Sequence, residues 1–187
     1  MNALEWEAAW APYDADTYQA ALSYIDPTDV VLDIGAGDLR FARRAANRAR
    51  HVFAVELNPA RLKLWPDTAG RLTVVCADAL RTAIPHTVTV AVLLMRHCQH
   101  FAQYVDRLRA AGCQRLITNA RWGMGVECLS LSRQVVFEAA APGWYACRCG
   151  RVGFKACPPE WITAEMLQRD QSVEDCPACR LALASGA

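Results

Sequence analysis

The stretch that decides the fold covers residues 30–38 and reads Val30-Val31-Leu32-Asp33-Ile34-Gly35-Ala36-Gly37-Asp38. Its first five residues are apolar except for one aspartate, which is typical of a buried strand, and the glycines that follow end that strand. Beyond them the apolar residues Phe41, Ala42, Ala45, Ala46 and Ala49 recur at helical spacing. A strand, a glycine turn and a helix in this order predict the first half of a βαβ unit.

Four further apolar runs continue the same alternation along the chain. We expect strands at residues 51–56, 72–76, 88–94 and 115–118, with helical segments between them, among them 58–64 and 101–111. A helix over residues 18–25 precedes the first strand. This order predicts an α/β protein with a doubly wound, mostly parallel sheet. Residues 127–137 could add two more strands as an antiparallel edge.

Composition limits the classes of protein that the chain can be. It has 187 residues, 53% of them hydrophobic and 21% charged, so it can bury a core. The formal net charge is +1, which excludes a strongly basic nucleic-acid binder as a description of the whole chain. The first residues are acidic and lack the features of a signal peptide, and the apolar run at 88–95 is too short to span a bilayer. We therefore expect a soluble, cytoplasmic protein without a membrane partner.

The loop after the first strand is the expected ligand site, because open α/β sheets bind ligands at the carboxyl ends of their strands. Gly35 allows a tight turn, and Gly37 lets the backbone approach a ligand closely. Glu56 ends the second strand and can accept hydrogen bonds from the hydroxyls of a ribose. Other readings stay open: Asp33 could be a helix-terminal charge, and Asp78 a turn residue or a helix cap.

Three ordered motifs narrow the choice of ligand, namely Leu32-Asp33-Ile34-Gly35-Ala36-Gly37, Val55-Glu56-Leu57-Asn58-Pro59 and Cys76-Ala77-Asp78-Ala79-Leu80. Together they resemble the class I S-adenosylmethionine-dependent methyltransferases, which have a Rossmann-like fold, over roughly residues 30 to 120. The resemblance implies that the first motif, with Asp33, Gly35 and Gly37, binds the methionine part of the cofactor. It also implies that Glu56 binds the ribose and that Asp78 contacts the adenine. Arg40 disfavours NAD, because a dinucleotide fingerprint needs a small residue there.

The sequence departs from this family's pattern in two places. Leu39 stands where a third glycine is frequent. The first and third motifs resemble those of the rRNA adenine dimethyltransferases, but the Asn-Leu-Pro-Tyr type motif that grips an amino group is missing. The fourth strand is followed instead by Leu94-Met95-Arg96-His97-Cys98, which argues against an amino-adenine acceptor.

Candidates for the chemistry follow the fourth and fifth strands. We expect His97 to act as the base, since its unperturbed pKa lies near neutrality, and Arg96 to hold a carboxylate or phosphate of the substrate. It is equally open that His97 only caps or packs near the next helix. Asn119 is a further polar candidate. Aromatic residues in the segment 10–18 could cover the cofactor or could pack against the edge of the sheet.

The last forty residues or so carry a different pattern. Five of the nine cysteines gather there: Cys147, Cys149, Cys157, Cys176 and Cys179. Two close pairs predict a tetrahedral zinc site formed by Cys147, Cys149, Cys176 and Cys179, an arrangement that resembles a zinc ribbon. Cys157 could replace Cys147, and a redox dithiol at Cys176/Cys179, an iron–sulfur cluster or inert thiols stay open.

These patterns divide the chain into residues 1–141, an S-adenosylmethionine-binding methyltransferase domain, and residues 142–187, a small metal-binding β element. The first hypothesis is an enzyme that transfers the methyl group of S-adenosylmethionine to RNA or protein rather than to a small molecule. The zinc element would then aid substrate recognition or stability, and its cations Arg148, Arg151, Lys155 and Arg180 could meet phosphates or could be a solvated surface. The second hypothesis is a non-catalytic S-adenosylmethionine-binding module that acts through its zinc ribbon on nucleic acid or protein.

Overall fold

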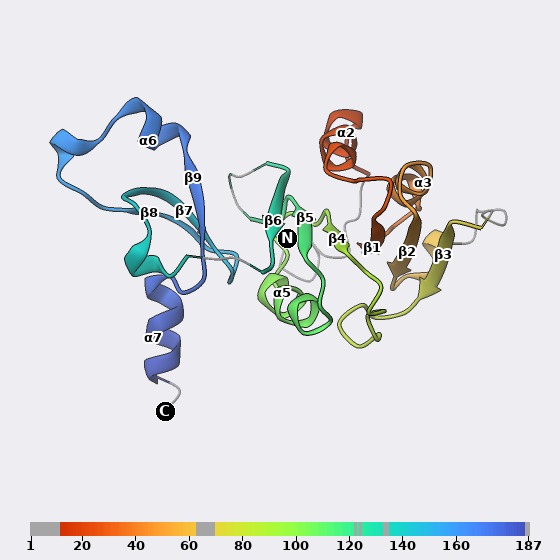
Figure 1. The fold of residues 1–187 in the computed structure, drawn as a ribbon. Helices are drawn as coiled ribbons and strands as arrows, with labels where there is room; N and C mark the ends of the chain where they lie inside the picture. Colours follow the sequence, from red (N-terminus) through yellow and green to blue (C-terminus); the bar gives the residue numbers. More distant parts are fainter. Residues whose placement is uncertain (1–11, 63–69, 122, 124, 133–134, 186–187) are drawn as a thin grey trace.

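A computed structural model describes residues 12–62, 70–121, 123, 125–132 and 135–185. Its larger part contains a six-stranded sheet in the order β3-β2-β1-β4-β5-β6 (Figure 1). The strands are β1 (Val30–Ile34), β2 (His51–Glu56), β3 (Leu72–Cys76), β4 (Val90–Leu93), β5 (Arg115–Thr118) and β6 (Glu127–Ser130). The first five are parallel, and β6 pairs antiparallel with β5. The strand order reverses between β1 and β4, where doubly wound sheets bind their ligands.

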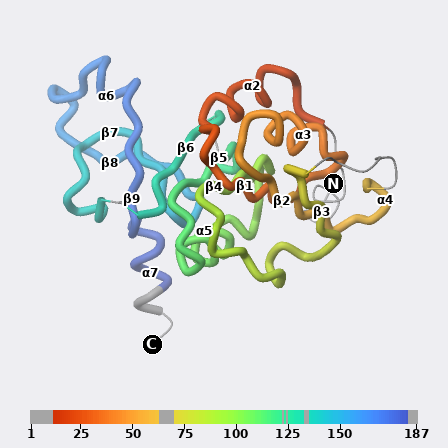
Figure 2. Tube along the Cα trace, turned by 45° about the vertical axis from the view of Figure 1, so that its right-hand side comes forward, coloured from red at the N-terminus to blue at the C-terminus, as the bar shows by residue number. Residues whose placement is uncertain are grey.

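Helices cover both faces of this sheet, as Figures 1 and 2 show. On one face α2 (Ala15–Ser23) and α3 (Arg40–Ala46) pack through Tyr18 and Phe41. On the other face α5 (Phe101–Ala110) packs through Phe101 and Leu108. A short helix, α4 (Pro59–Leu62), follows β2. Burial on both faces explains why β4 is apolar throughout and β1 is apolar except at Asp33.

The structure confirms the doubly wound α/β fold and corrects four local expectations. The helix after the glycine turn ends at Ala46, and β4 begins two residues later than expected, at Val90. Of the described residues in the segment 127–137, Glu127–Ser130 form a strand, and Val135 makes a single bridge to Val173 instead of a second strand at this edge. No helix joins β3 to β4: residues 77–89 form turns, beginning with one that the Asp78 side chain stabilises.

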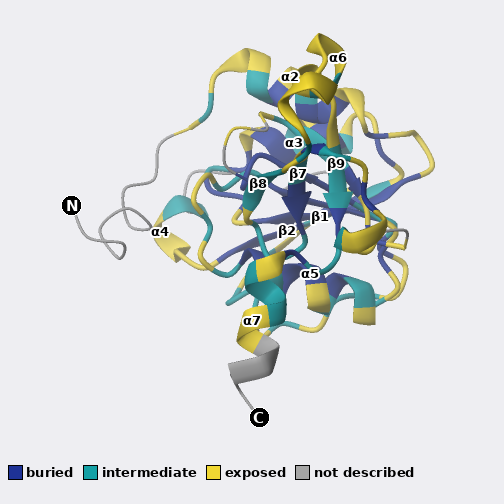
Figure 3. Ribbon diagram, turned by 90° about the vertical axis from the view of Figure 1, so that its left-hand side faces the viewer, coloured by how far each residue is buried: buried dark blue, intermediate teal, exposed yellow. Residues whose placement is uncertain are grey.

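The smaller part is built on a three-stranded sheet in the order β8-β7-β9. Its strands β7 (Gly143–Cys147) and β8 (Val152–Lys155) form an antiparallel hairpin. The third strand, β9 (Asp170–Val173), is parallel to β7. The remaining elements are the 3-10 turns η1 (Phe137–Ala139) and η2 (Pro159–Trp161) and the helices α6 (Ala164–Gln168) and α7 (Pro177–Ser185). Figure 3 shows that α6 is largely exposed, whereas the strands of this sheet are mostly of intermediate burial, with buried residues in β7 and at the end of β9.

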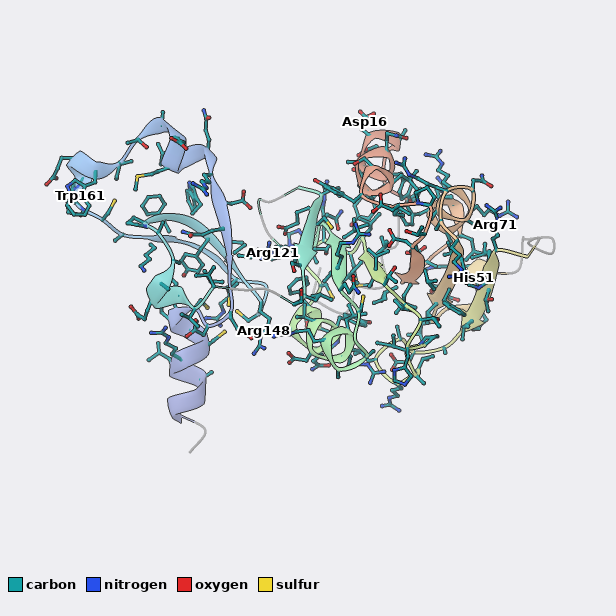
Figure 4. The ribbon with its side chains drawn as sticks, in the orientation of Figure 1. Asp16, His51, Arg71, Arg121, Arg148 and Trp161 are labelled. Carbon is teal, nitrogen blue, oxygen red and sulfur yellow. The ribbon has the colours of Figure 1, made fainter. Side chains whose placement is uncertain are left out.

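One arginine joins the two sheets. The side chain of Arg121, which is 1% exposed, forms an ion pair with Glu127 at the start of β6. It also donates to the carbonyl of Ala146 in β7 at 2.9 Å and to the hydroxyl of Ser172 in β9 at 3.3 Å. Figure 4 shows Arg121 at this junction. Because its hydrogen bonds reach three strands, Arg121 ties the smaller sheet to the edge of the larger one.

A second contact lies in the turn that joins β7 to β8. Gly150 packs on the ring of Phe101, which is the first residue of α5. Nearby, Glu174 accepts hydrogen bonds from Arg109 of α5 and from Arg148, at 2.7 and 3.3 Å. In the part of the chain that the structure describes, no helix is both long and apolar enough to cross a bilayer.

Candidate functional site

The glycine turn after β1 has the tight backbone that its sequence predicts. Gly35 and Gly37 have φ angles of 72° and 55°, in the left-handed region that favours glycine. The amides of Gly35 and Ala36 both donate to the carbonyl of Val55, at 2.9 and 3.0 Å, so the turn is attached to the end of β2. A Cβ atom on Gly35 would lie 3.0 Å from the Met95 methyl group. A side chain at Gly35 would therefore be strained by the φ angle and would have to displace the Met95 methyl group.

Leu39 occupies the position where the related pattern has a third glycine. Its φ angle is 63°, so the backbone keeps a left-handed conformation although the residue is not glycine. That conformation costs a residue with a side chain about 1–2 kcal/mol. The Leu39 side chain is 1% exposed and packs in the core between the sheet and α3, and this burial offsets the cost. The sequence departure thus leaves the shape of the turn unchanged.

Glu56, the candidate ribose ligand, lies beside the glycine turn. One of its carboxylate oxygens accepts from the amide of Gly37 at 2.8 Å, and the other accepts from the amide of Asn58 at 2.8 Å. Arg61 approaches the second oxygen at 3.4 Å. A carboxylate offers about four lone-pair sites, and three of them are engaged here, so the oxygen that meets Gly37 can still accept a hydroxyl. The structure therefore brings Gly37 and Glu56 together as expected.

Asp33 carries a buried carboxyl group near the carboxyl end of β1. The residue is 4% exposed, and its Oδ2 atom has no hydrogen-bond partner. Burial, with a smaller contribution from the nearby Glu56 carboxylate, raises the pKa of Asp33 to about 7. A cationic group bound at this position would relieve both effects. Asp33 therefore fits the ammonium group of S-adenosylmethionine, for which the sequence proposes it.

Asp78 follows β3 at the same edge of the sheet. Its Oδ1 atom accepts from the amide of Leu80 at 2.8 Å, and Arg81 lies 3.5 Å from its other oxygen. Asp78 therefore stabilises its own turn. The sequence left this role open as the alternative to adenine binding. Its contact with adenine stays a prediction.

The residues after β4 meet an aromatic pair from the start of the chain. The amide of Arg96 donates to the Tyr13 hydroxyl at 2.9 Å, and the Arg96 guanidinium lies 5.5 Å from the centre of the Tyr13 ring. Tyr18 packs edge-on against Tyr13, with 6.3 Å between ring centres. His97 is exposed and has a φ angle of 61°, a conformation that histidine adopts more readily than most residues. Of the expected aromatic cover, Trp10 lies outside the described residues, whereas Tyr13 and Tyr18 do lie at this edge.

Two polar residues after β5 are buried. Asn119 is 5% exposed, and neither its Oδ1 nor its Nδ2 atom has a hydrogen-bond partner. Arg121, two residues later, forms the junction between the two sheets, a role that the sequence analysis missed. The opposite charge of Glu127, six residues after Arg121, could have indicated the ion pair. Opposite charges at such a spacing are, however, common in loops.

The cysteine centre assembles as predicted. The Sγ atoms of Cys147, Cys149, Cys176 and Cys179 all lie within 4.8 Å of one another, and Cys157 is not part of this group. Three of the separations are 3.7, 3.8 and 3.7 Å, for the pairs 147–179, 149–176 and 176–179. Four thiolates at the usual Zn–S distance of about 2.3 Å around a tetrahedral ion stand about 3.8 Å apart. These three of the six separations therefore match the spacing of ligands in a tetrahedral zinc site.

Most of the cations near this centre have intramolecular partners. Lys155 donates to three backbone carbonyls, those of Phe137, Glu138 and Ala140. Arg180 pairs with Asp175 and Glu138, and Arg148 with Glu174 and Asp106. Lys155, Arg148 and Arg180 are therefore less available to bind phosphates than the sequence suggests. Arg151, in contrast, is exposed.

Comparison with known proteins points to one family. The family model for ribosomal RNA adenine dimethylase matches residues 15–120. Probable ribosomal RNA small subunit methyltransferase A from Methanosarcina mazei is 38% identical over 68 residues, which are 35% of this chain and 25% of that protein. The protein of the same name from Methanosarcina barkeri is 34% identical over 68 residues, 35% of this chain and 24% of that protein. The match thus spans about a quarter of the length of these curated relatives.

Among solved structures, a dimethyladenosine transferase from Plasmodium falciparum matches with a TM-score of 0.46 and 14% identity, covering 56% of this chain and 41% of that one. The family model extends over more than half of the chain, from α2 to the end of β5, and includes the glycine turn, Glu56 and Asp78. The chain therefore belongs to the ribosomal RNA adenine dimethylase family, a family of S-adenosylmethionine-dependent methyltransferases.

Proposed function

We propose that this chain binds S-adenosylmethionine at the carboxyl ends of β1, β2 and β3 and transfers its methyl group to RNA. The observation that carries the proposal is Asp33, a buried carboxylate without a partner, beside a glycine turn whose Gly37 amide meets Glu56. An unpartnered buried carboxylate destabilises a fold, so its presence at a ligand-binding edge supports a bound cation. The family match supports RNA as the acceptor class.

Each residue has a role in this proposal. Asp33 binds the ammonium group, and the turn at Gly35 and Gly37 lets the ligand approach the backbone. Glu56 accepts the ribose hydroxyls, and Asp78 lies where the adenine would pack. When bound, the cofactor supplies an electrophilic methyl group on a sulfonium, with a neutral thioether as the leaving group.

On the acceptor side, the chain has to orient a nucleophile in line with the methyl group and remove its proton. Arg96 is exposed after β4 and can pair with a phosphate of the RNA. His97, next to it, can take the proton that the acceptor loses as its new bond to the methyl carbon forms. The chain lacks the Asn-Leu-Pro-Tyr type motif, so Arg96 and His97 do not identify which atom of the RNA accepts the methyl group.

We propose that the cysteine centre binds one zinc ion and that residues 142–187 form a metal-stabilised unit. The spacing of the four thiols supports this, as does the small apolar core around them, whose buried members are Ala140, Cys147, Val173 and Cys176. The unit would stabilise the edge of the larger sheet through Arg121 and contribute to substrate recognition. All nine cysteines are free thiols, which supports a cytoplasmic location.

Two measurements on the full chain test the proposal. Calorimetry should detect binding of S-adenosylmethionine and of S-adenosylhomocysteine, and tritium from labelled cofactor should enter an unmodified small-subunit rRNA transcript. Gly37→Arg is the matched control: it should abolish cofactor binding and leave the zinc content unchanged. Binding without transfer to RNA would favour the non-catalytic module, and the absence of binding would refute the proposal altogether.

A further inference from the structure

Asn119 has an environment that folding alone does not explain. Both polar atoms of its amide are buried, and neither has a hydrogen-bond partner. Buried amides are normally paired, because an unpaired one loses its hydrogen bonds to water without replacement. In the described part of the chain, Asp33 and Asn119 are the residues whose buried side-chain oxygens lack a partner. A leucine of similar size would fill the same space without that cost.

The sheet places Asn119 next to the proposed cofactor pocket. The order β1-β4-β5 brings the carboxyl ends of these strands side by side, and Thr118 is in register with Leu93. The Thr118 hydroxyl donates to the Leu93 carbonyl at 2.8 Å and accepts from the amide of Ala120 at 3.0 Å. These bonds hold the backbone on both sides of Asn119.

The neighbours along this edge connect Asn119 to the glycine turn. On β4, the chain leaves the sheet through Leu94 and Met95, and the Met95 methyl group packs against Gly35. Ile117, two residues before Asn119, packs in the same core cluster as Tyr18, with Tyr13 and Leu94 at its margin. Asn119 follows directly after the last residue of β5, at this same edge of the sheet.

We propose that Asn119 binds the methyl acceptor, through the edge of a nucleobase that presents one hydrogen-bond donor beside one acceptor. A primary amide has the complementary pair, a carbonyl oxygen and an NH2 group. The inference rests on the proposed methyl transfer to RNA. Under this proposal the two residues with unpartnered buried oxygens bind different ligands: Asp33 binds the cofactor, and Asn119 binds the methyl acceptor. Asn119 is 5% exposed in the structure, so binding of a base requires the atoms over the amide to move.

Substitution of Asn119 by leucine and by alanine tests this assignment. With an unmodified small-subunit rRNA transcript as the substrate, kcat/KM should fall about 10- to 100-fold in both variants, because a two-point base contact is lost. The affinity for S-adenosylmethionine should stay within about twofold of the wild type. The melting temperature of Asn119→Leu should equal or exceed that of the wild type. Asn47→Ala, which changes an exposed asparagine after α3, is the control and should change none of these quantities.

Three results would overturn the inference. Unchanged kcat/KM in both variants would show that the amide does not touch the acceptor. A lower melting temperature of Asn119→Leu, with parallel losses of cofactor affinity and activity, would show a structural role. A wild-type protein that binds the cofactor but methylates no RNA would refute the proposed acceptor class, and the inference with it. The first two results leave the proposed function intact.

Discussion

Asp33→Asn should make the protein more stable near neutral pH while it weakens cofactor binding. The pKa of Asp33 is about 7 in the folded chain, against an ordinary value of 3.8. The difference is about three units, and each unit corresponds to about 1.4 kcal/mol. Burial of the charged carboxylate therefore costs about 4 kcal/mol of folding free energy above the folded-state pKa. Asparagine has a similar shape and carries no charge.

The direction of the pH dependence follows from proton binding. Between about pH 4 and pH 7 the folded state holds the Asp33 proton and the unfolded state does not. The free energy of unfolding of the wild type therefore falls as the pH rises through this interval. Asp33→Asn lacks this contribution, so the difference between the two proteins should be near zero at about pH 4 and should reach about 4 kcal/mol at about pH 8.

Urea denaturation followed by circular dichroism measures this difference at a series of pH values. Other groups, including the cysteine centre, titrate equally in both proteins and cancel in the difference. Calorimetry at about pH 6 should show a proton released when the wild type binds S-adenosylmethionine, since the bound ammonium favours the ionised Asp33. Parallel pH profiles, or a variant that is less stable than the wild type at about pH 8, would refute the reasoning.

Three further substitutions test other parts of the structure. Cys176→Ser should lower the zinc content, measured by mass spectrometry, from about one per chain to near zero while S-adenosylmethionine still binds; undiminished zinc would exclude the proposed ligand set. Arg121→Met should lower the free energy of unfolding by about 3–5 kcal/mol, since it leaves Glu127 without its buried partner. Adding Glu127→Leu to this variant should restore at least half of the lost free energy. If urea denaturation shows no loss in Arg121→Met, the role of the junction is contradicted. Leu39→Gly should lower the free energy of unfolding by about 1–2 kcal/mol, because the loss of a buried side chain outweighs the relief of the left-handed backbone strain. A higher melting temperature of the variant would show that the backbone strain outweighs the packing.

Elements that depend on local pattern could be predicted from the sequence. The glycine turn, the ends of β1 and β2 and the partnership of Gly37 with Glu56 follow from spacing within one βαβ unit. The four zinc-ligand candidates could be chosen because two close pairs of soft ligands are rare by chance. Residues 77–89 and 127–137 were predicted less well, because turns there replace periodic patterns that the sequence shows only weakly.

The sequence by itself determined the doubly wound sheet, the glycine turn and the thiol set, because each is built from patterns of residues that lie close together along the chain. Only the tertiary structure decided which polar groups lack partners and which cations are occupied. Asp33, Asn119 and Arg121 look alike in sequence, as single polar residues at strand ends. They differ because long-range packing leaves two of them without hydrogen bonds and surrounds the third with partners from β6, β7 and β9. Burial and pairing are properties of contacts between distant segments, which no local pattern records.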